Sequence, residues 1–362
     1  MLFITRWFGV TGCDADRDLA REQSDIEGIT ESVLLMQANA AAKQHRPLAR
    51  GTHAKGVSVR AEFEVFDVTI GRDAGLAARL AKGMFATPGV YPAVVRFGNA
   101  DSKKSSDFKG DVRSLAFSVD LTRGGTAVSA PHTGRQDFAM QNATTLPIND
   151  SPAMNASLKL LATSNPAACL CSLPFKDKLR VLRTVILTEF QTHQPIKPYQ
   201  QMRYWSNVPF RHGAAEVAKY SAIPSPDNLS RPLQKDNPNG LQDELIRHVQ
   251  EDSRMSSFNF GIQLLDTQRM TYWGKRQDAN FWIENASIEW KETEAPFHLI
   301  ARLTLLPKSH LGPDAAEATY IDVCGNSTPD RTPLGSINRA RGSAEGACRK
   351  ARMRGRSSGE PS

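Results

Sequence analysis

Apolar residues recur along this chain with two different periods, and each period predicts a different kind of element. In several stretches they recur every three to four positions, which is typical of an amphipathic helix with one buried face. This spacing predicts helices over residues 26–43, 154–163, 175–191 and 241–250. We expect Asp25 or Thr30 to cap the first helix and Pro47 to end it.

Runs rich in β-branched and aromatic residues lie on either side of the helical middle of the chain. They predict strands over residues 61–70, 93–98, 114–119, 257–265, 286–290 and 298–306. The polar stretch 99–111 is expected to form a loop, and residues 237–240 (N-P-N-G) a turn. Strands, then helices, then strands again, without a regular β-α-β alternation, predict an α+β fold with a mainly antiparallel sheet or barrel.

Most of the net charge lies at one end of the chain. The 362 residues carry a formal charge of +7, and residues 339–362 hold seven basic and two acidic side chains. A nucleic-acid binder usually spreads its basic residues over a folded face and interleaves aromatic residues that stack on bases. The sequence shows neither pattern, so we expect no nucleic-acid partner. Binding of an acidic surface through the tail is the alternative.

The remaining composition predicts a cytoplasmic protein. No apolar run reaches the ~20 residues that a membrane-spanning helix needs, and a strongly charged stretch replaces the cleavage site of a signal peptide. The five cysteines are sparse. Cys169 and Cys171 form a C-x-C pair, but no second pair or nearby histidine completes a tetrahedral metal site. Reduced thiols are the simpler interpretation.

One short segment carries candidate chemistry. Residues 50–56 read R-G-T-H-A-K-G and lead directly into the first predicted strand. Further blocks follow in order: P-A-V-V-R-F at 92–97, D-V-R-S-L-A-F at 111–117 and D-F-A-M-Q-N at 137–142. Together they resemble the catalase superfamily. Two later blocks, at 283–290 and 333–341, resemble its smaller, catalase-related haem peroxidases, and the likeness extends over about residues 45–352.

The resemblance implies a fold, a cofactor and a reaction. The fold would be a catalase-like antiparallel β-barrel flanked by helices, with haem b bound against it. Residues 26–352 would form the haem-binding domain, between an N-terminal extension (1–25) and a disordered basic tail (353–362). The substrate would be hydrogen peroxide or an organic (lipid) hydroperoxide, and an unidentified electron donor would complete the cycle. A homo-oligomer is compatible with the sequence.

On the peroxide side of the haem, the resemblance assigns two catalytic residues. His53 matches the distal histidine, and a histidine suits proton transfer near neutral pH because its unperturbed pKa is ~6.5. Asn142 matches the distal asparagine, whose amide can hydrogen-bond a peroxide without titrating. Gln141 occupies the neighbouring position, so the match could shift by one residue.

Haem also needs cationic partners for its two propionates. The resemblance places these at Arg50, Arg96 and Arg352. Thr52 precedes the histidine where true catalases commonly carry a bulky apolar residue, which favours the peroxidase and hydroperoxide-transforming branches. Gly98 replaces the serine that usually supports the distal histidine.

The iron ligand departs from the family pattern. The family supplies a tyrosinate in R-x-x-x-Y, but four residues after Arg341 stands Glu345, and no tyrosine follows Tyr320. Glu345 is the candidate by position and Cys348 the candidate by chemistry. Two hypotheses therefore stand: a haem-dependent peroxidase or catalase-like oxidoreductase, and a catalase-fold protein without haem that binds a hydrophobic ligand or a partner.

Overall fold

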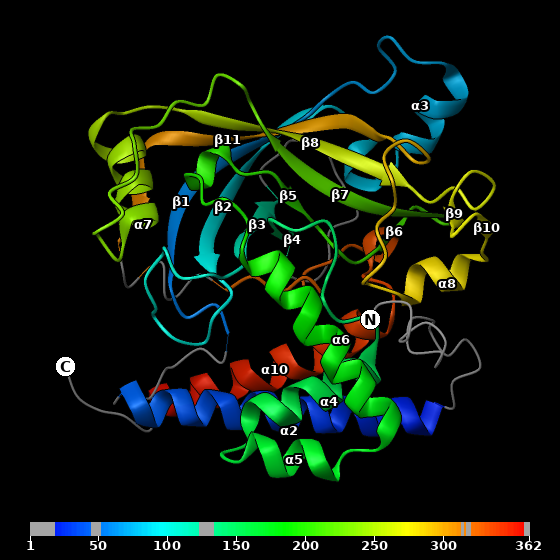
Figure 1. The fold of residues 1–362 in the computed structure, drawn as a ribbon. Helices are drawn as coiled ribbons and strands as arrows, with labels where there is room; N and C mark the ends of the chain where they lie inside the picture. Colours follow the sequence, from blue (N-terminus) through cyan, green and yellow to red (C-terminus); the bar gives the residue numbers. More distant parts are fainter. Residues whose placement is uncertain (1–18, 45–51, 123–133, 313–314, 316–319, 358–362) are drawn as a thin grey trace.

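The computed structural model describes residues 19–44, 52–122, 134–312, 315 and 320–357 (Figure 1). Their strands are β1 (Gly56–Val65), β2 (Gly89–Asn99), β3 (Arg113–Asp120), β4 (Arg135–Gln141), β5 (Tyr204–Trp205), β6 (Phe210–His212), β7 (Glu216–Pro224), β8 (Ser256–Leu264), β9 (Thr271–Tyr272), β10 (Lys275–Arg276) and β11 (Phe297–Leu311). Their helices are α2 (Leu19–Gln44), α3 (Ala74–Leu80), α4 (Ser151–Ala162), α5 (Pro166–Ser172), α6 (Phe175–Thr192), α7 (Gly240–Ile246), α8 (Ala279–Glu284) and α10 (Ser336–Ser357).

Eight of the strands close into an antiparallel barrel. They follow the order β5-β4-β3-β2-β1-β11-β8-β7, and β7 pairs back to β5. The short strand β5 is therefore the closing strand, since Trp205 pairs with Gln141 of β4 and with Ser221 of β7. Strand β6 pairs with residues 216–218 of β7, before the residues of β7 that pair with β5, and β9 and β10 form a separate hairpin. The predicted α+β fold with an antiparallel barrel is confirmed.

Aromatic side chains fill the barrel interior. Phe63, Phe117, Phe138 and Phe260 come from four different strands, and their ring centroids lie 4.7 to 6.0 Å apart. Each is at most 2% exposed. An eight-stranded barrel is just wide enough for side chains to fill it, so this barrel has a packed core and the chemistry must lie at its ends or on its outside.

A layer of long helices lies beneath the barrel in Figure 1, where α2 and α10 run alongside each other. Ile29 of α2, Leu158 of α4 and Ala340 and Ala344 of α10 form their shared apolar core. At the edge of this core, Arg339 of α10 forms ion pairs with two carboxylates, from Glu22 and Glu284. The helix layer therefore joins the two ends of the described chain.

Most predicted helices are confirmed, but the N-terminal helix begins earlier than expected. It starts at Leu19, so neither Asp25 nor Thr30 caps it. The Asp25 carboxylate instead accepts a hydrogen bond from Asn155 (2.9 Å), and the Thr30 hydroxyl donates to the Ile26 carbonyl (2.8 Å). Pro47 lies outside the described residues.

Two strand predictions differ from the structure. The first strand is shifted and ends at Val65, because Asp67 accepts hydrogen bonds from the amide and hydroxyl of Thr69 and turns the chain. The strand predicted at 286–290 is wrong. Its alternating apolar residues are buried, but the Ala286 amide donates to Asn149 and its carbonyl accepts from Leu146, both in a loop. Residues 286–290 therefore show the alternating burial of a strand without belonging to a sheet.

The basic C-terminal segment is mostly helical rather than disordered. Helix α10 continues to Ser357, five residues into the range expected to be a free tail. Its glycines lower its intrinsic helix propensity, whereas its alanines and arginines favour a helix. Packing of small residues on α2 adds tertiary stabilisation, since Ala340 and Ala344 are at most 5% exposed. Residues 358–362 and 1–18 lie outside the described part of the chain.

A buried ion pair joins three segments at the end of the barrel where β1 begins. Lys55 Nζ lies 2.8 Å from Asp107 Oδ1, and both side chains are at most 5% exposed. The same ammonium donates to the carbonyls of Ser105 and Pro238, while the other Asp107 oxygen accepts from the Leu241 amide. The predicted loop 99–111 and the predicted turn 237–240 thus meet on one lysine.

Removing the ammonium should be costly because it leaves a carboxylate buried without its cation. We expect Lys55→Met to lower the free energy of unfolding by about 3–5 kcal/mol, measured by urea denaturation followed by circular dichroism. Adding Asp107→Asn should recover part of this loss, since no charge is then buried. The exposed pair Lys291–Glu294 is the matched control, and Lys291→Met should cost less than about 1 kcal/mol. Equal losses at the two lysines would contradict the assignment.

Candidate functional site

His53 is held in an unusual backbone conformation just before β1. Its φ is +52°, in the left-handed region that side chains with a Cβ rarely adopt. Its amide donates to the Ala100 carbonyl (3.2 Å), and its own carbonyl accepts from Arg96 Nη2 (3.0 Å). The half-buried imidazole is thus positioned by the end of β2, whose pairing with β1 extends through these bonds.

Two glycines allow the strands to approach each other at this point. A Cβ on Gly56 would lie 2.5 Å from the Phe97 carbonyl oxygen, and one on Gly98 would lie 2.7 Å from the Lys55 carbonyl oxygen. The latter contact explains the missing serine. No side chain fits at position 98 while the Arg96 guanidinium lies beside it, 3.1 Å from the same point. In this protein Arg96 therefore supports the His53 backbone in place of a hydroxyl.

Asn142 lies at the same end of the barrel. Two backbone donors link it to the segment that holds His53. The Ala100 amide donates to the Val112 carbonyl, and the amide of the next residue, Arg113, donates to the Asn142 side chain. The Asn142 amide oxygen accepts from the Arg113 backbone amide at 2.7 Å. This bond fixes the orientation of the side chain, so its NH₂ group is directed away from β3 as a donor.

Two other predicted site residues, Arg50 and Thr52, precede His53 in the sequence. Arg50 lies outside the described residues. Thr52 is the first described residue after this gap, and its side chain is exposed. The structure describes no hydrogen bond of its hydroxyl.

The second group of predicted residues lies on α10. Figure 1 shows this helix across the end of the barrel at which β1 begins. Glu345 Oε1 accepts from Arg341 Nε at 2.6 Å, one helical turn away. Its other oxygen, Oε2, is buried and has no hydrogen-bond partner within the described chain. A buried carboxylate oxygen without a partner is costly, and this makes it available to a ligand.

Cys348 is a poorer candidate for a ligand. Burial, and secondarily the Glu345 carboxylate, raise the pKa of the Cys348 thiol to about 11. The thiolate is the form that binds metals, and it is scarce near neutral pH at such a pKa. Arg352, one turn further on, is close enough to lower this pKa, so its guanidinium is near the same face of α10.

Asp137 joins the barrel to the segment that precedes α10. Its carboxylate accepts from the Asp322 amide (2.7 Å) and from Asn326 Nδ2 (2.8 Å). Burial raises the pKa of Asp137 to about 6, and the hydrogen bonds oppose this rise. Further along the segment, Cys324 lies 3.2 Å from the point that a Cβ on Gly342 would occupy. A side chain at position 342 would therefore be in tight contact with Cys324, and the glycine leaves room for α10 beside the segment.

Three of the described residues could hold a haem group. The unpartnered Glu345 oxygen offers an anionic donor for iron. Arg96 and Arg352 offer cations for the propionates on the barrel and on α10. Arg96 Nη2 also donates to the His53 backbone carbonyl.

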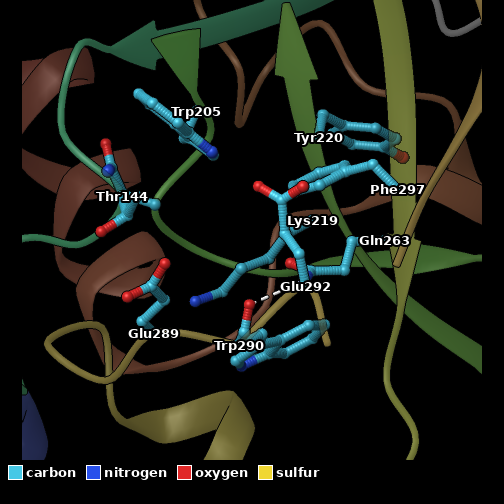
Figure 2. Close-up of a pocket in the computed structure, with 10 residues that line it drawn as sticks. Thr144, Trp205, Lys219, Tyr220, Gln263, Glu289, Trp290, Glu292 and Phe297 are labelled. Atoms are coloured by element: carbon cyan, nitrogen blue, oxygen red, sulfur yellow. Dashed lines mark hydrogen bonds between the residues drawn. The ribbon is translucent and has the colours of Figure 1, made fainter. Parts of the chain in front are cut away.

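A separate hollow was not anticipated from the sequence. It lies outside the barrel, where Lys219 of β7 is only 4% exposed among aromatic side chains (Figure 2). A lysine between Ala218 and Tyr220, both buried, was the available signal, because a central strand rarely carries a lysine in such surroundings. No group of three or more His, Cys, Asp or Glu side chains within the described residues could hold a metal ion. None of the described helices is long and apolar enough to cross a membrane.

Comparisons with known proteins agree with this geometry at the level of the fold. No protein-family model matches the chain, and no curated protein sequence matches it either. Solved structures do match. A fungal catalase superposes with a TM-score of 0.60 and 15% identity, over 84% of this chain and 60% of the catalase. Catalase A from Saccharomyces cerevisiae gives 0.60 and 16%, over 87% and 63% of the two chains.

A bacterial catalase gives a TM-score of 0.57 and 14% identity, over 89% of this chain and 60% of the catalase. The chain thus spans about three fifths of the length of the catalases that it matches. The described residues have the catalase fold, an eight-stranded antiparallel barrel with flanking helices.

Proposed function

We propose that the protein is a haem-dependent peroxidase or catalase-like oxidoreductase that acts on hydrogen peroxide or an organic hydroperoxide. One observation carries this proposal. His53 is held in a strained conformation by the buried Arg96, at a barrel end that α10 crosses. Strain of this kind persists only where the surrounding structure enforces it, and it is common at functional sites.

In this proposal His53 is the proton carrier. Bound haem would supply the iron at which the peroxide O–O bond breaks. His53 takes the proton from the peroxide oxygen that faces it and returns it to the oxygen that leaves as water or alcohol. An imidazole can do both near neutral pH. The Asn142 amide donates a hydrogen bond to the peroxide, because its oxygen already accepts from Arg113.

The other residues would hold the cofactor. Arg96, Arg352 and Arg50 would pair with the propionates, and Glu345 would supply an oxygen ligand to the iron. A carboxylate is a weaker donor to ferric iron than a tyrosinate is, and Arg341 withdraws further charge from it through their 2.6 Å hydrogen bond. Thr52 makes the surroundings of His53 more polar than the bulky apolar residue that is common in true catalases would. Both features favour a peroxidase cycle with an external electron donor over rapid dismutation.

Haem binding and its ligand can be tested by spectroscopy. Protein expressed with haem supply should show a Soret band, with haem counted as the pyridine haemochrome. Glu345→Ala should lower the haem content and shift the spectrum, and Glu345→Tyr should restore the haem content with a spectrum that differs from both, because its ligand is a tyrosinate. Cys348→Ala is the matched control on the same helix and should leave the spectrum unchanged. A wild-type protein without haem would overturn the proposal in favour of the haem-free binding protein.

The catalytic role of His53 predicts a specific kinetic defect. His53→Gln should lower the peroxidase rate by about 10²- to 10⁴-fold, which is the usual contribution of a positioned acid-base group. The haem content should stay the same. His193, an exposed histidine at the end of α6, is the control, and His193→Gln should keep the wild-type rate. A His53→Gln variant that binds haem and keeps its rate would exclude His53 as the proton carrier.

A further inference from the structure

Helix α6 turns apolar side chains to the outside of the molecule, which is the reverse of an ordinary surface helix. Figure 1 shows α6 in front of the other helices, running from the helix layer towards the barrel. On its outer side Leu182, Val185 and Phe190 are 36, 49 and 69% exposed, and Leu179 and Ile186 are partly exposed. Successive helix residues are about 100° apart, so these five lie within an arc of roughly 140°. They form the α6 face.

The inner side of α6 is polar and fastens the helix in this orientation. Arg183 is only 6% exposed, and its Nη2 donates to the Ser287 hydroxyl at 2.8 Å. Near the end of the helix, Gln191 Nε2 donates to the Thr145 carbonyl at 3.0 Å. These bonds cannot form if the helix turns its apolar side inward. A continuous exposed apolar face, unlike apolar residues scattered singly over a surface, is typical of an interaction surface.

Two residues of opposite charge flank the α6 face on the same side. Lys178 and Glu189 are about 20° apart around the helix axis but about 16 Å apart along it, so they cannot pair within one chain. Glu189 Oε2 lies 3.4 Å from Nδ1 of the exposed His193, which is a cation only when it is protonated. The structure describes no ion pair of Lys178. Both charges are therefore available to a second molecule.

We propose that the α6 face joins two copies of this chain, with their α6 helices antiparallel about a twofold axis that passes between them. Such an axis keeps each flank on its own side, so Lys178 of one copy faces Glu189 of the second copy, and the symmetry repeats this pair. The axis lies midway between Lys178 and Glu189, which is also midway between Leu182 and Val185. One arrangement therefore satisfies both the charges and the apolar centre.

The charges distinguish this occupant from others. In a parallel pair the opposite flanks of the two helices meet, so Lys178 and Glu189 would not face each other. A membrane with anionic lipids would attract Lys178 but repel Glu189. Two helices of 18 residues make a small contact, so we expect a reversible dimer. None of the residues assigned above to haem or peroxide lies on α6, so this pairing goes beyond the proposed function.

Sedimentation velocity of the full-length protein over a range of concentrations tests the proposal. The wild type should change from monomer to dimer below about 100 µM. Leu182→Glu places a carboxylate next to the axis in both copies, so it should weaken dimerisation at least about tenfold. Ile70→Glu, at an exposed apolar residue in the turn after β1, is the matched control and should leave dimerisation unchanged. A dimer that Leu182→Glu does not weaken would overturn the proposal, and so would a wild type that stays monomeric or binds anionic vesicles instead.

Charge reversals test the antiparallel arrangement itself. Lys178→Glu and Glu189→Lys should each weaken dimerisation at least about threefold, because like charges then meet at both ends of the contact. An equal mixture of the two variants should associate as well as the wild type, since opposite charges meet again in the mixed dimer. Lys275→Glu, on the exposed strand β10, is the control and should have no effect. If Leu182→Glu misfolds by circular dichroism, the mixture decides. A mixture that associates no better than each variant alone would exclude this pairing.

Discussion

The arrangement of this protein around its candidate site depends on one buried ion pair, Lys55 with Asp107. The two residues that precede Lys55 take part in the contact with the end of β2, and the lysine itself fastens the loop 99–111 and the turn before α7 to β1. In a low-dielectric interior neither charge is tolerated alone. Once both are present, they fix the chain that follows His53, and this helps to hold the histidine in its strained conformation.

Much of the fold could be predicted from the sequence, because the local signals and the global packing agree in most elements. The amphipathic spacing located α6 to within one residue, and α4 with a start three residues too late. The errors occur where tertiary contacts override the local pattern. Helix α10 has a composition typical of a flexible tail, and it is helical because small residues pack on α2. Residues 286–290 alternate like a strand, yet they are covered by a loop.

The two halves of the candidate site differ in how well the sequence described them. On the barrel, the R-x-x-H-A-K-G block singled out His53 and the P-A-V-V-R-F block singled out Arg96. The Arg96 guanidinium donates to the His53 backbone carbonyl, which spacing alone could not reveal. On α10, position singled out Glu345, and only the structure distinguishes its unpartnered oxygen from the neutral thiol of Cys348. The Lys219 hollow depends on segments far apart in the chain, so no local motif marks it.

The pairing of α2 with α10 has a consequence for the order of events during synthesis. Arg339 reaches back to Glu22 across 317 positions of sequence, so the first long helix emerges from the ribosome well before its partner exists. Until then only α4, through Leu158, can cover the apolar residues around Ile29, and the part that α10 would cover stays exposed, which invites premature association. The barrel can close earlier, since its last strand ends at Leu311. The helix layer, and with it the Glu345 side of the candidate site, is therefore completed only after all the strands of the barrel have been made.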